Sequence, residues 1–148
     1  LSNRLSRLVK TPKVHLGDSG LASALIGADA AVLREDRRLF GHVLETFVLQ
    51  ELRRLDSGAD AATAFLHFRD KDGAEVDVVL DRGAQGLAGV EVKASATVGA
   101  EDFRGLHKLK AAVGARFRSG VVLYDGETCA PFGEKMFAVP IRRLWENP

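Results

Sequence analysis

Two short acidic stretches decide the fold: Glu75-Val76-Asp77-Val78-Val79-Leu80 and Val90-Glu91-Val92-Lys93. Aspartate and glutamate are disfavoured in β-strands, where β-branched and aromatic residues fit better. Carboxylates inside two apolar runs therefore call for a reason. The tripeptide Asp81-Arg82-Gly83 follows the first stretch and is a turn signal. The two stretches are predicted to pair as neighbouring strands of a β-hairpin.

Side-chain alternation places the charged residues of each predicted strand on one face. With a period of two residues, Glu75 and Asp77 share a face on the first strand. The apolar residues between and after them point the other way: Val76, Val78 and Leu80. On the second strand, Glu91 and Lys93 share a face. If the two polar faces coincide, carboxylates converge beside a lysine, which suits a hard divalent metal ion and a phosphate.

The alternative is purely structural. The same side chains would form cross-strand ion pairs on a solvated sheet face, each stabilising by roughly 0.2–1 kcal/mol. A Glu-x-Lys triplet by itself is short enough to arise by chance in a chain of 148 residues. The context favours a site, because the triplet lies in an apolar strand, after an acidic strand and downstream of a helix that carries glutamates.

That helix is expected over residues 41–55, since its apolar residues recur at helical spacing and Asp56-Ser57-Gly58 is a stop signal. Glu45 lies at the edge of the apolar arc, where its carboxylate can lean over the sheet towards the acids of the hairpin. Glu51 projects from the middle of the arc, where an uncompensated charge is costly. We expect Arg69 to be its partner. Both glutamates lie on this helix, so either Glu45 or Glu51 could be the helix carboxylate of the site.

Composition limits the class of protein. The 148 residues are 46% hydrophobic and 28% charged, which is typical of one globular domain. The net charge of +1 gives no global basic field, so contact with nucleic acid would need a local patch. The candidates for such a patch are Lys10, Lys13, Arg34, Arg37 and Arg38.

The chain's surroundings are also constrained. Cys129 is the single cysteine, so no intrachain disulfide forms and a reducing, cytoplasmic location is expected. No run of 18 apolar residues predicts a membrane span, and no signal-peptide pattern appears. The sequence opens on Leu1 and contains one methionine, Met136. We expect it to be a fragment of a longer chain.

The order of elements predicts an α/β fold with a mixed central sheet flanked by helices. Residues 1–40 are expected to form a lead-in segment packed on the core, with an extended piece or short strand at 12–16, a helix that Asp18-Ser19 caps, that runs through Leu21–Leu25 and that Gly27 ends, and a polar stretch at 28–40. The core, 41–148, follows in the same globular domain. After the hairpin its predicted elements are a helix at 101–113, strands at 120–124 and 136–139, and a helical turn at 141–145.

These residues resemble a known group of enzymes. The order of a helix with Glu45, a strand with Asp77, a strand with Glu91-Val92-Lys93, a helix and a strand resembles the core of the PD-(D/E)xK nuclease superfamily. Nearly the whole chain more closely resembles DUF4143, usually the C-terminal part of predicted AAA+-type ATPases of bacteria and archaea. The runs that carry this resemblance are Lys10–Lys13, Asp18–Leu21, Gly41–Glu45, Arg69-Asp70, Asp72–Asp77, Glu91–Ser95 and Val122–Tyr124.

The resemblance implies a restriction-endonuclease-like αβββαβ core. It further implies that Asp77 and Glu91 bind Mg²⁺ or Mn²⁺, that Glu45 contributes from the helix, and that Lys93 is the catalytic lysine. Val76 stands where the superfamily's eponymous proline would be. DNA and an ATPase half of the same chain are the implied partners. These residues contain no G-x-x-x-x-G-K-[ST] motif, so they should not bind ATP through a P-loop.

Two functions of different classes follow. The first is a divalent-metal-dependent nuclease-like domain, a phosphodiesterase, that acts on or binds DNA. The alternative is a catalytically inactive module of nuclease fold that binds DNA or a partner or regulates the ATPase. The intact set of Asp77, Glu91 and Lys93 favours the first function. The near-neutral charge favours the second, because nucleases usually carry a clearer basic footprint.

Overall fold

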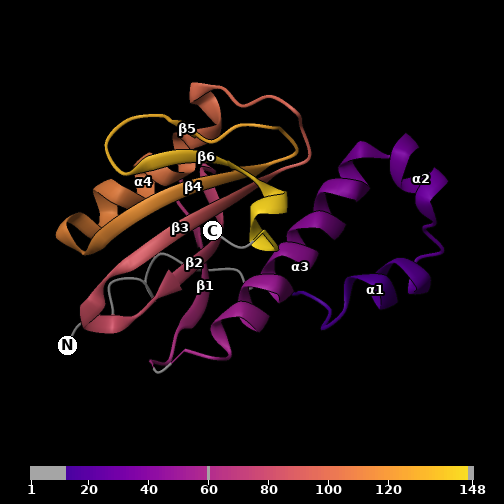
Figure 1. The fold of residues 1–148 in the computed structure, drawn as a ribbon, viewed down its shortest axis with the longest axis horizontal. Helices are drawn as coiled ribbons and strands as arrows, with labels where there is room; N and C mark the ends of the chain where they lie inside the picture. Colours follow the sequence, from indigo (N-terminus) through magenta and orange to yellow (C-terminus); the bar gives the residue numbers. More distant parts are fainter. Residues whose placement is uncertain (1–12, 60, 147–148) are drawn as a thin grey trace.

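The computed structural model describes residues 13–59 and 61–146, which form a six-stranded mixed sheet with helices (Figure 1). The strand order is β1-β2-β3-β4-β6-β5. The β3–β4 and β4–β6 pairs are parallel and the other pairs are antiparallel. The predicted α/β class and mixed sheet are therefore confirmed. The strands are β1 (Ala64–Arg69), β2 (Glu75–Asp81), β3 (Leu87–Lys93), β4 (Phe117–Tyr124), β5 (Ala130–Pro131) and β6 (Met136–Pro140).

Four α-helices accompany the strands in the described residues: α1 (Ser19–Leu25), α2 (Ala30–Glu35), α3 (Arg37–Asp56) and α4 (Arg104–Val113). Short 3-10 turns complete the structure: η2 (Gly83–Gln85), η3 (Ala100–Phe103), η4 (Gly114–Arg116) and η5 (Ile141–Leu144). Figure 1 shows α1 and α2 beside α3, on the side away from the sheet. No helix in the described ranges is both long enough and apolar enough to cross a membrane.

The main helix starts earlier than the sequence predicts. Asp36 accepts a hydrogen bond from the backbone N–H of Leu39, so the helix begins at Arg37 rather than at Gly41. No helix was predicted within the polar stretch at 28–40, but α2 lies there, with Asp29 as its N-cap. Asparagine, aspartate, serine and threonine are favoured caps because their oxygens satisfy free N–H groups of the first turn. Two capping aspartates thus turn a charged stretch into helix. At 12–16, where an extended piece or a short strand was predicted, the described residues 13–16 form no strand, which excludes the second alternative for them.

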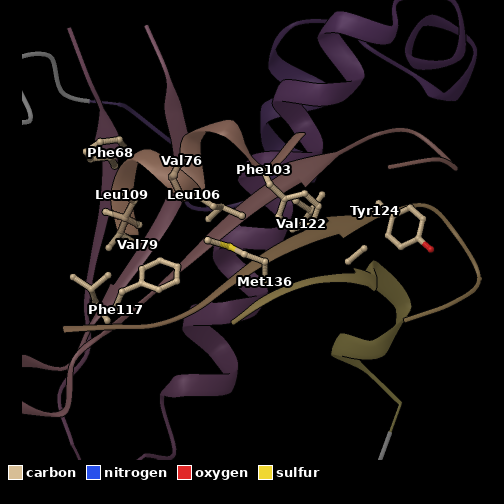
Figure 2. Close-up of a cluster of buried hydrophobic side chains, with 12 residues drawn as sticks. Phe68, Val76, Val79, Phe103, Leu106, Leu109, Phe117, Val122, Tyr124 and Met136 are labelled. Atoms are coloured by element: carbon tan, nitrogen blue, oxygen red, sulfur yellow. The ribbon is translucent and has the colours of Figure 1, made fainter. Parts of the chain in front are cut away.

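The sheet is covered by one helix on each face. On one face, Val48 and Leu49 of α3 pack against a cluster that includes Val78, Val90 and Leu123. On the other face, α4 and the 3-10 turn before it pack on a larger cluster (Figure 2). Its labelled members are Phe68, Val76, Val79, Phe103, Leu106, Leu109, Phe117, Val122, Tyr124 and Met136. This three-layer packing holds the strand ends in place between two helices.

Helix α4 approaches the sheet closely enough to touch its backbone. A Cβ atom built on Gly105 would lie 1.7 Å from the carbonyl oxygen of Glu75. A Cβ on Gly89, in the middle of β3, would lie 2.6 Å from the Leu106 side chain. Glycine at these two positions therefore lets the helix and the sheet come together without a side chain between them.

A bulge in β2 breaks the alternation expected from the sequence. Leu66 of β1 pairs with Val79, whereas Phe68 pairs with Val76, so Asp77 and Val78 together oppose the single residue between them. Val78 consequently packs with α3, while Val76 packs with α4. The prediction that Val76 and Val78 share a face is wrong. The hairpin itself is confirmed, because β2 and β3 pair antiparallel from Val78↔Val90 to Asp81↔Leu87.

Candidate functional site

The bulge residue Asp77 is the centre of the candidate site. Its side chain is 8% exposed, and its Oδ2 accepts a hydrogen bond of 2.9 Å from the backbone N–H of Val92. The carboxylate therefore continues the contact between β2 and β3 beyond the last pair of the ladder, Val78↔Val90. Its other oxygen, Oδ1, accepts a hydrogen bond of 2.9 Å from Nζ of Lys13. Asp77 is thus held by one strand neighbour and one cation.

Glu91 lies next to Asp77, and one of its carboxyl oxygens has no hydrogen-bond partner among the described residues. Alternation along β3 puts Glu91 on the side of α4, opposite Val90 and Val92, which pack with α3. Its side chain is 14% exposed, and its Oε2 is buried without a hydrogen-bond partner among the described residues. Burial, and then the negative charge of Asp77, raise the pKa of Glu91 to about 8, against the opposing attraction of Lys93. At this position a protonated or cation-bound carboxyl group is therefore favoured over a free carboxylate.

Lys93 stands between two acids on the α4 side. Its Nζ is 3.4 Å from Oε1 of Glu91 and 3.6 Å from Oδ1 of Asp102 in η3. Burial lowers the pKa of Lys93, but attraction to Glu91 and Asp102 outweighs it and the net pKa is raised. The ammonium is therefore charged, and its side chain is 35% exposed, so a solvent-borne anion can reach it.

Glu45 approaches the site from α3, on the other side of the sheet. Its Oε2 is 2.7 Å from Nζ of Lys13, the same ammonium that binds Asp77. His42, one helical turn earlier, places its Nδ1 3.9 Å from the same oxygen. Lys13 was expected in a basic patch for nucleic acid; instead it joins the two acids. No local signal in the sequence could have found this, because Lys13 precedes Asp77 by 64 positions.

Glu51, the competing helix carboxylate, is engaged elsewhere. Its Oε2 accepts hydrogen bonds from Arg54 and from the indole N–H of Trp145. These hydrogen bonds lower the pKa of Glu51. The bond from Arg54 has the larger effect and the bond from Trp145 the smaller one. The prediction that Arg69 pairs with Glu51 is wrong, because Arg69 pairs with Glu75 at 2.9 Å. Of the two glutamates, it is Glu45 whose carboxylate shares a cation with Asp77.

The expected basic patch is divided among different roles. Arg37 donates a hydrogen bond to the carbonyl of Ala94 and packs its guanidinium over the ring of Phe40. It therefore ties the start of α3 to the end of β3. Arg34 lies in the last turn of α2, where a cation favours the helix dipole. Lys10 lies outside the described residues.

The donor set fits a divalent cation in its chemistry. No group of three or more His, Cys, Asp or Glu side chains within residues 13–59 and 61–146 is arranged to hold a metal ion. However, Mg²⁺ keeps several waters and is commonly bound through only one or two carboxylates. Asp77 and Glu91 are two adjacent hard-oxygen donors, and the orphaned Oε2 of Glu91 is a buried oxygen that a cation would satisfy.

Comparison with known proteins identifies the family. A family model described as a domain of unknown function, DUF4143, matches residues 40–144. The chain belongs to this family. The expected resemblance to DUF4143 is thereby confirmed, and all four predicted site residues lie within the matched range, whereas Lys13 precedes it. As a DUF4143 domain, the chain shares a family whose description assigns no activity.

Two curated relatives are equally similar to this DUF4143 domain. One is an uncharacterized protein of Mycobacterium tuberculosis and the other an uncharacterized protein of Mycobacterium bovis. Each is 27% identical over 135 residues, which cover 91% of this chain. The same alignment covers 29% of each relative, so the chain spans less than a third of their length.

Proposed function

We propose that this domain is a divalent-metal-dependent, nuclease-like phosphodiesterase of restriction-endonuclease-like fold that acts on DNA. The observation that carries the proposal is the pair of Asp77 and Glu91 beside Lys93. Burial, and then the charge of Asp77, raise the pKa of Glu91, and its buried Oε2 has no hydrogen-bond partner among the described residues, so the pair favours a bound proton or cation over two free carboxylates. An ammonium on the same strand supplies a donor for the anionic substrate. The helix, strand and Glu-x-Lys order resembles the PD-(D/E)xK core.

In this proposal Asp77 and Glu91 hold Mg²⁺ or Mn²⁺, and Glu45 is the further carboxylate from α3. When bound, the metal ion would lower the pKa of a coordinated water and neutralise charge on the phosphate. Lys93 donates hydrogen bonds to the phosphate oxygens and to the attacking water, and stabilises the charge that develops at phosphorus. Asp77 holds the strand ends together through Val92, so that the acids and the lysine keep their spacing.

The second candidate function is an inactive module that binds DNA or a partner, or regulates an ATPase in the same chain. One observation favours it: Lys13 already neutralises Glu45 and Asp77, so two of the three acids have a resident cation. A small net charge of +1 also gives little attraction for DNA. For either function we further propose that the partner is DNA, that an ATPase half belongs to the same polypeptide, and that the protein is cytoplasmic.

Metal binding tests the proposal first. Calorimetric titration of Mn²⁺ and Mg²⁺ into the wild-type domain should give binding that Asp77→Asn removes. Asparagine keeps an acceptor for the Val92 N–H, so the fold should persist. It lacks the negative charge, so metal binding should be lost. The matched control is Glu75→Gln, which removes an exposed carboxylate from the same strand. No binding at millimolar metal, either by the wild type or by a variant that lacks the Lys13 charge, would favour the inactive module.

Cleavage by the Lys93→Ala variant tests the catalytic role. We expect cleavage of DNA to fall at least about 100-fold, because one preorganised donor to a transition-state oxyanion contributes roughly 10²–10³ in rate. The fold should remain intact, since Lys93 is partly exposed and makes only long ion pairs. Lys108→Ala is the control, because Lys108 pairs with Asp70 and Asp72 outside the site. Equal cleavage by wild type and Lys93→Ala would indicate a contaminating nuclease.

A further inference from the structure

Residues 13–16, which we call the strap, lie along α3 and deliver Lys13 to the candidate site. Nδ1 of His15 is 3.0 Å from Oγ1 of Thr46, and the side chain of Gln50 donates a hydrogen bond of 3.0 Å to the carbonyl of Leu16. The strap has no regular secondary structure. It is therefore attached to α3 mainly through side chains rather than through a backbone ladder.

The strap ends in an ion pair with two of the three proposed metal ligands. Nζ of Lys13 is 2.7 Å from Oε2 of Glu45 and 2.9 Å from Oδ1 of Asp77. These contacts are those of a cation between two carboxylates that come from different elements, α3 and β2. A divalent ion bound between the same two carboxylates would lie close to the ammonium, and the repulsion between the two cations would oppose its binding.

Little apolar surface holds the strap in place. Val14 is 86% exposed and Leu16 is 45% exposed, so neither is buried against the core. Segments with few buried apolar contacts open at a low free-energy cost relative to global unfolding. The Lys13 side chain itself is 25% exposed, so its ion pair is open to water on one side. The strap can thus leave without unfolding the sheet.

We propose that the strap is an autoinhibitory element whose Lys13 ammonium takes the place of a divalent ion between Glu45 and Asp77. This inference rests on the proposed metal site. With the strap in place, a metal ion meets Glu91 and an Asp77 that is already neutralised. With the strap displaced, Glu45 and Asp77 lose their resident cation, and the repulsion between the two carboxylates favours another cation in its place. Release of Lys13 and binding of a divalent ion between Glu45 and Asp77 are therefore coupled.

An opposite role for Lys13 predicts the opposite result. If Lys13 were a permanent positioning cation that holds Glu45 and Asp77 at the right spacing, its loss would let the two acids separate. Metal affinity would then fall. If Lys13 competes with the metal, its loss raises metal affinity. The sign of the change distinguishes the two roles.

The experiment compares Mn²⁺ affinity, measured by calorimetry, between the wild-type domain and Lys13→Met. Methionine keeps an unbranched side chain of similar length without the charge. We expect Lys13→Met to bind Mn²⁺ at least about 10-fold more tightly. Lys13→Arg is the matched control, because it keeps the charge and should not bind more tightly than the wild type. Adding Glu45→Gln to Lys13→Met should remove the gain, since Glu45 is the ligand that the strap releases.

A second variant and a second readout leave the acids and the lysine unchanged. Gln50→Ala removes one anchor of the strap and should also raise Mn²⁺ affinity, by less than Lys13→Met does. In the wild-type domain, Mg²⁺ should speed amide hydrogen exchange at residues 14–16, while exchange in β3 stays slow. These measurements decide the matter even if Lys13→Met does not fold.

The outcomes separate the strap from the metal site. Equal or weaker Mn²⁺ binding by a folded Lys13→Met, with binding by the wild type, overturns the strap and leaves the proposed metal site standing. Binding by Lys13→Met alone supports both. Binding by neither protein at millimolar Mn²⁺ overturns both. Should Lys13→Met fail to fold, unchanged affinity in Gln50→Ala together with unchanged exchange at 14–16 overturns the strap.

Discussion

The free energy of unfolding of the metal-free protein is expected to fall between about pH 4.5 and 8, and replacing Glu91 with glutamine should remove most of that fall. Burial and the charge of Asp77 raise the pKa of Glu91 from 4.5 when unfolded to about 8 when folded. Over this range the folded state keeps the proton that the unfolded state releases. Raising the pH therefore favours unfolding, by on the order of 1 kcal/mol per pH unit. A glutamine cannot titrate, so this contribution disappears.

The measurement is urea denaturation of wild type and Glu91→Gln, with chelator present, at several values between pH 4.5 and 8.5. The two proteins should have similar free energies of unfolding near pH 4.5, and the variant should be the more stable above pH 8. Glu75→Gln is the control, because it removes an exposed carboxylate of the same strand outside the site, and this variant should keep the fall in stability that Glu91 causes. Parallel profiles for wild type and Glu91→Gln would show that the carboxyl is not held in its acid form.

Replacing Gly105 with alanine is expected to destabilise the domain by about 3 kcal/mol or more. The added Cβ would lie 1.7 Å from the carbonyl oxygen of Glu75, which is backbone and cannot rotate away. Relief requires α4 to shift away from β2, and such a shift would open the cluster that contains Leu106 and Val76. Overpacking of a tight interior usually costs 1–3 kcal/mol, and a backbone clash lies at the upper end of that range.

Chemical denaturation of Gly105→Ala against Gly41→Ala tests this expectation. Gly41 also lies inside a helix, but a Cβ there meets nothing within 4 Å. Because alanine is favoured over glycine in helices by roughly 1 kcal/mol, Gly41→Ala should be as stable as the wild type or slightly more so. A loss of less than about 1 kcal/mol in Gly105→Ala would mean that α4 does not touch the backbone of β2 at Glu75.

Elements that depend on local sequence were predictable. The hairpin of β2 and β3, the helix that carries Glu45 and the buried strand β4 all follow from periodicity and from turn residues within a few positions. The short helix α2 was not predicted, because six residues are too few to show a helical hydrophobic periodicity. Its N-cap Asp29 was the one local signal for a helix start. The expected strand boundaries at 120–124 and 136–139 agree with β4 and β6 to within a few residues.

The geometry of the site depended on features that local patterns do not contain. A strict period of two residues cannot predict the bulge at Asp77 and Val78, because a bulge is decided by pairing with the neighbouring strand. The Lys13 contacts join residues far apart in the chain. The partner of Glu51 was the exception, since Arg54 three residues later is a neighbour that helical spacing predicts. That spacing was a better guide than the more distant Arg69.

The two edges of the sheet differ in what they offer to another chain. The β5 edge consists of Ala130 and Pro131 alone, and proline has no N–H to donate. Strand-to-strand aggregation at that edge is therefore blocked within two residues. The β1 edge is six residues long and carries the exposed side chain of Leu66. Among the residues that the structure describes, β1 is thus the edge with the longer run of backbone groups for another strand to pair with, which makes Leu66 the place for a solubilising charge.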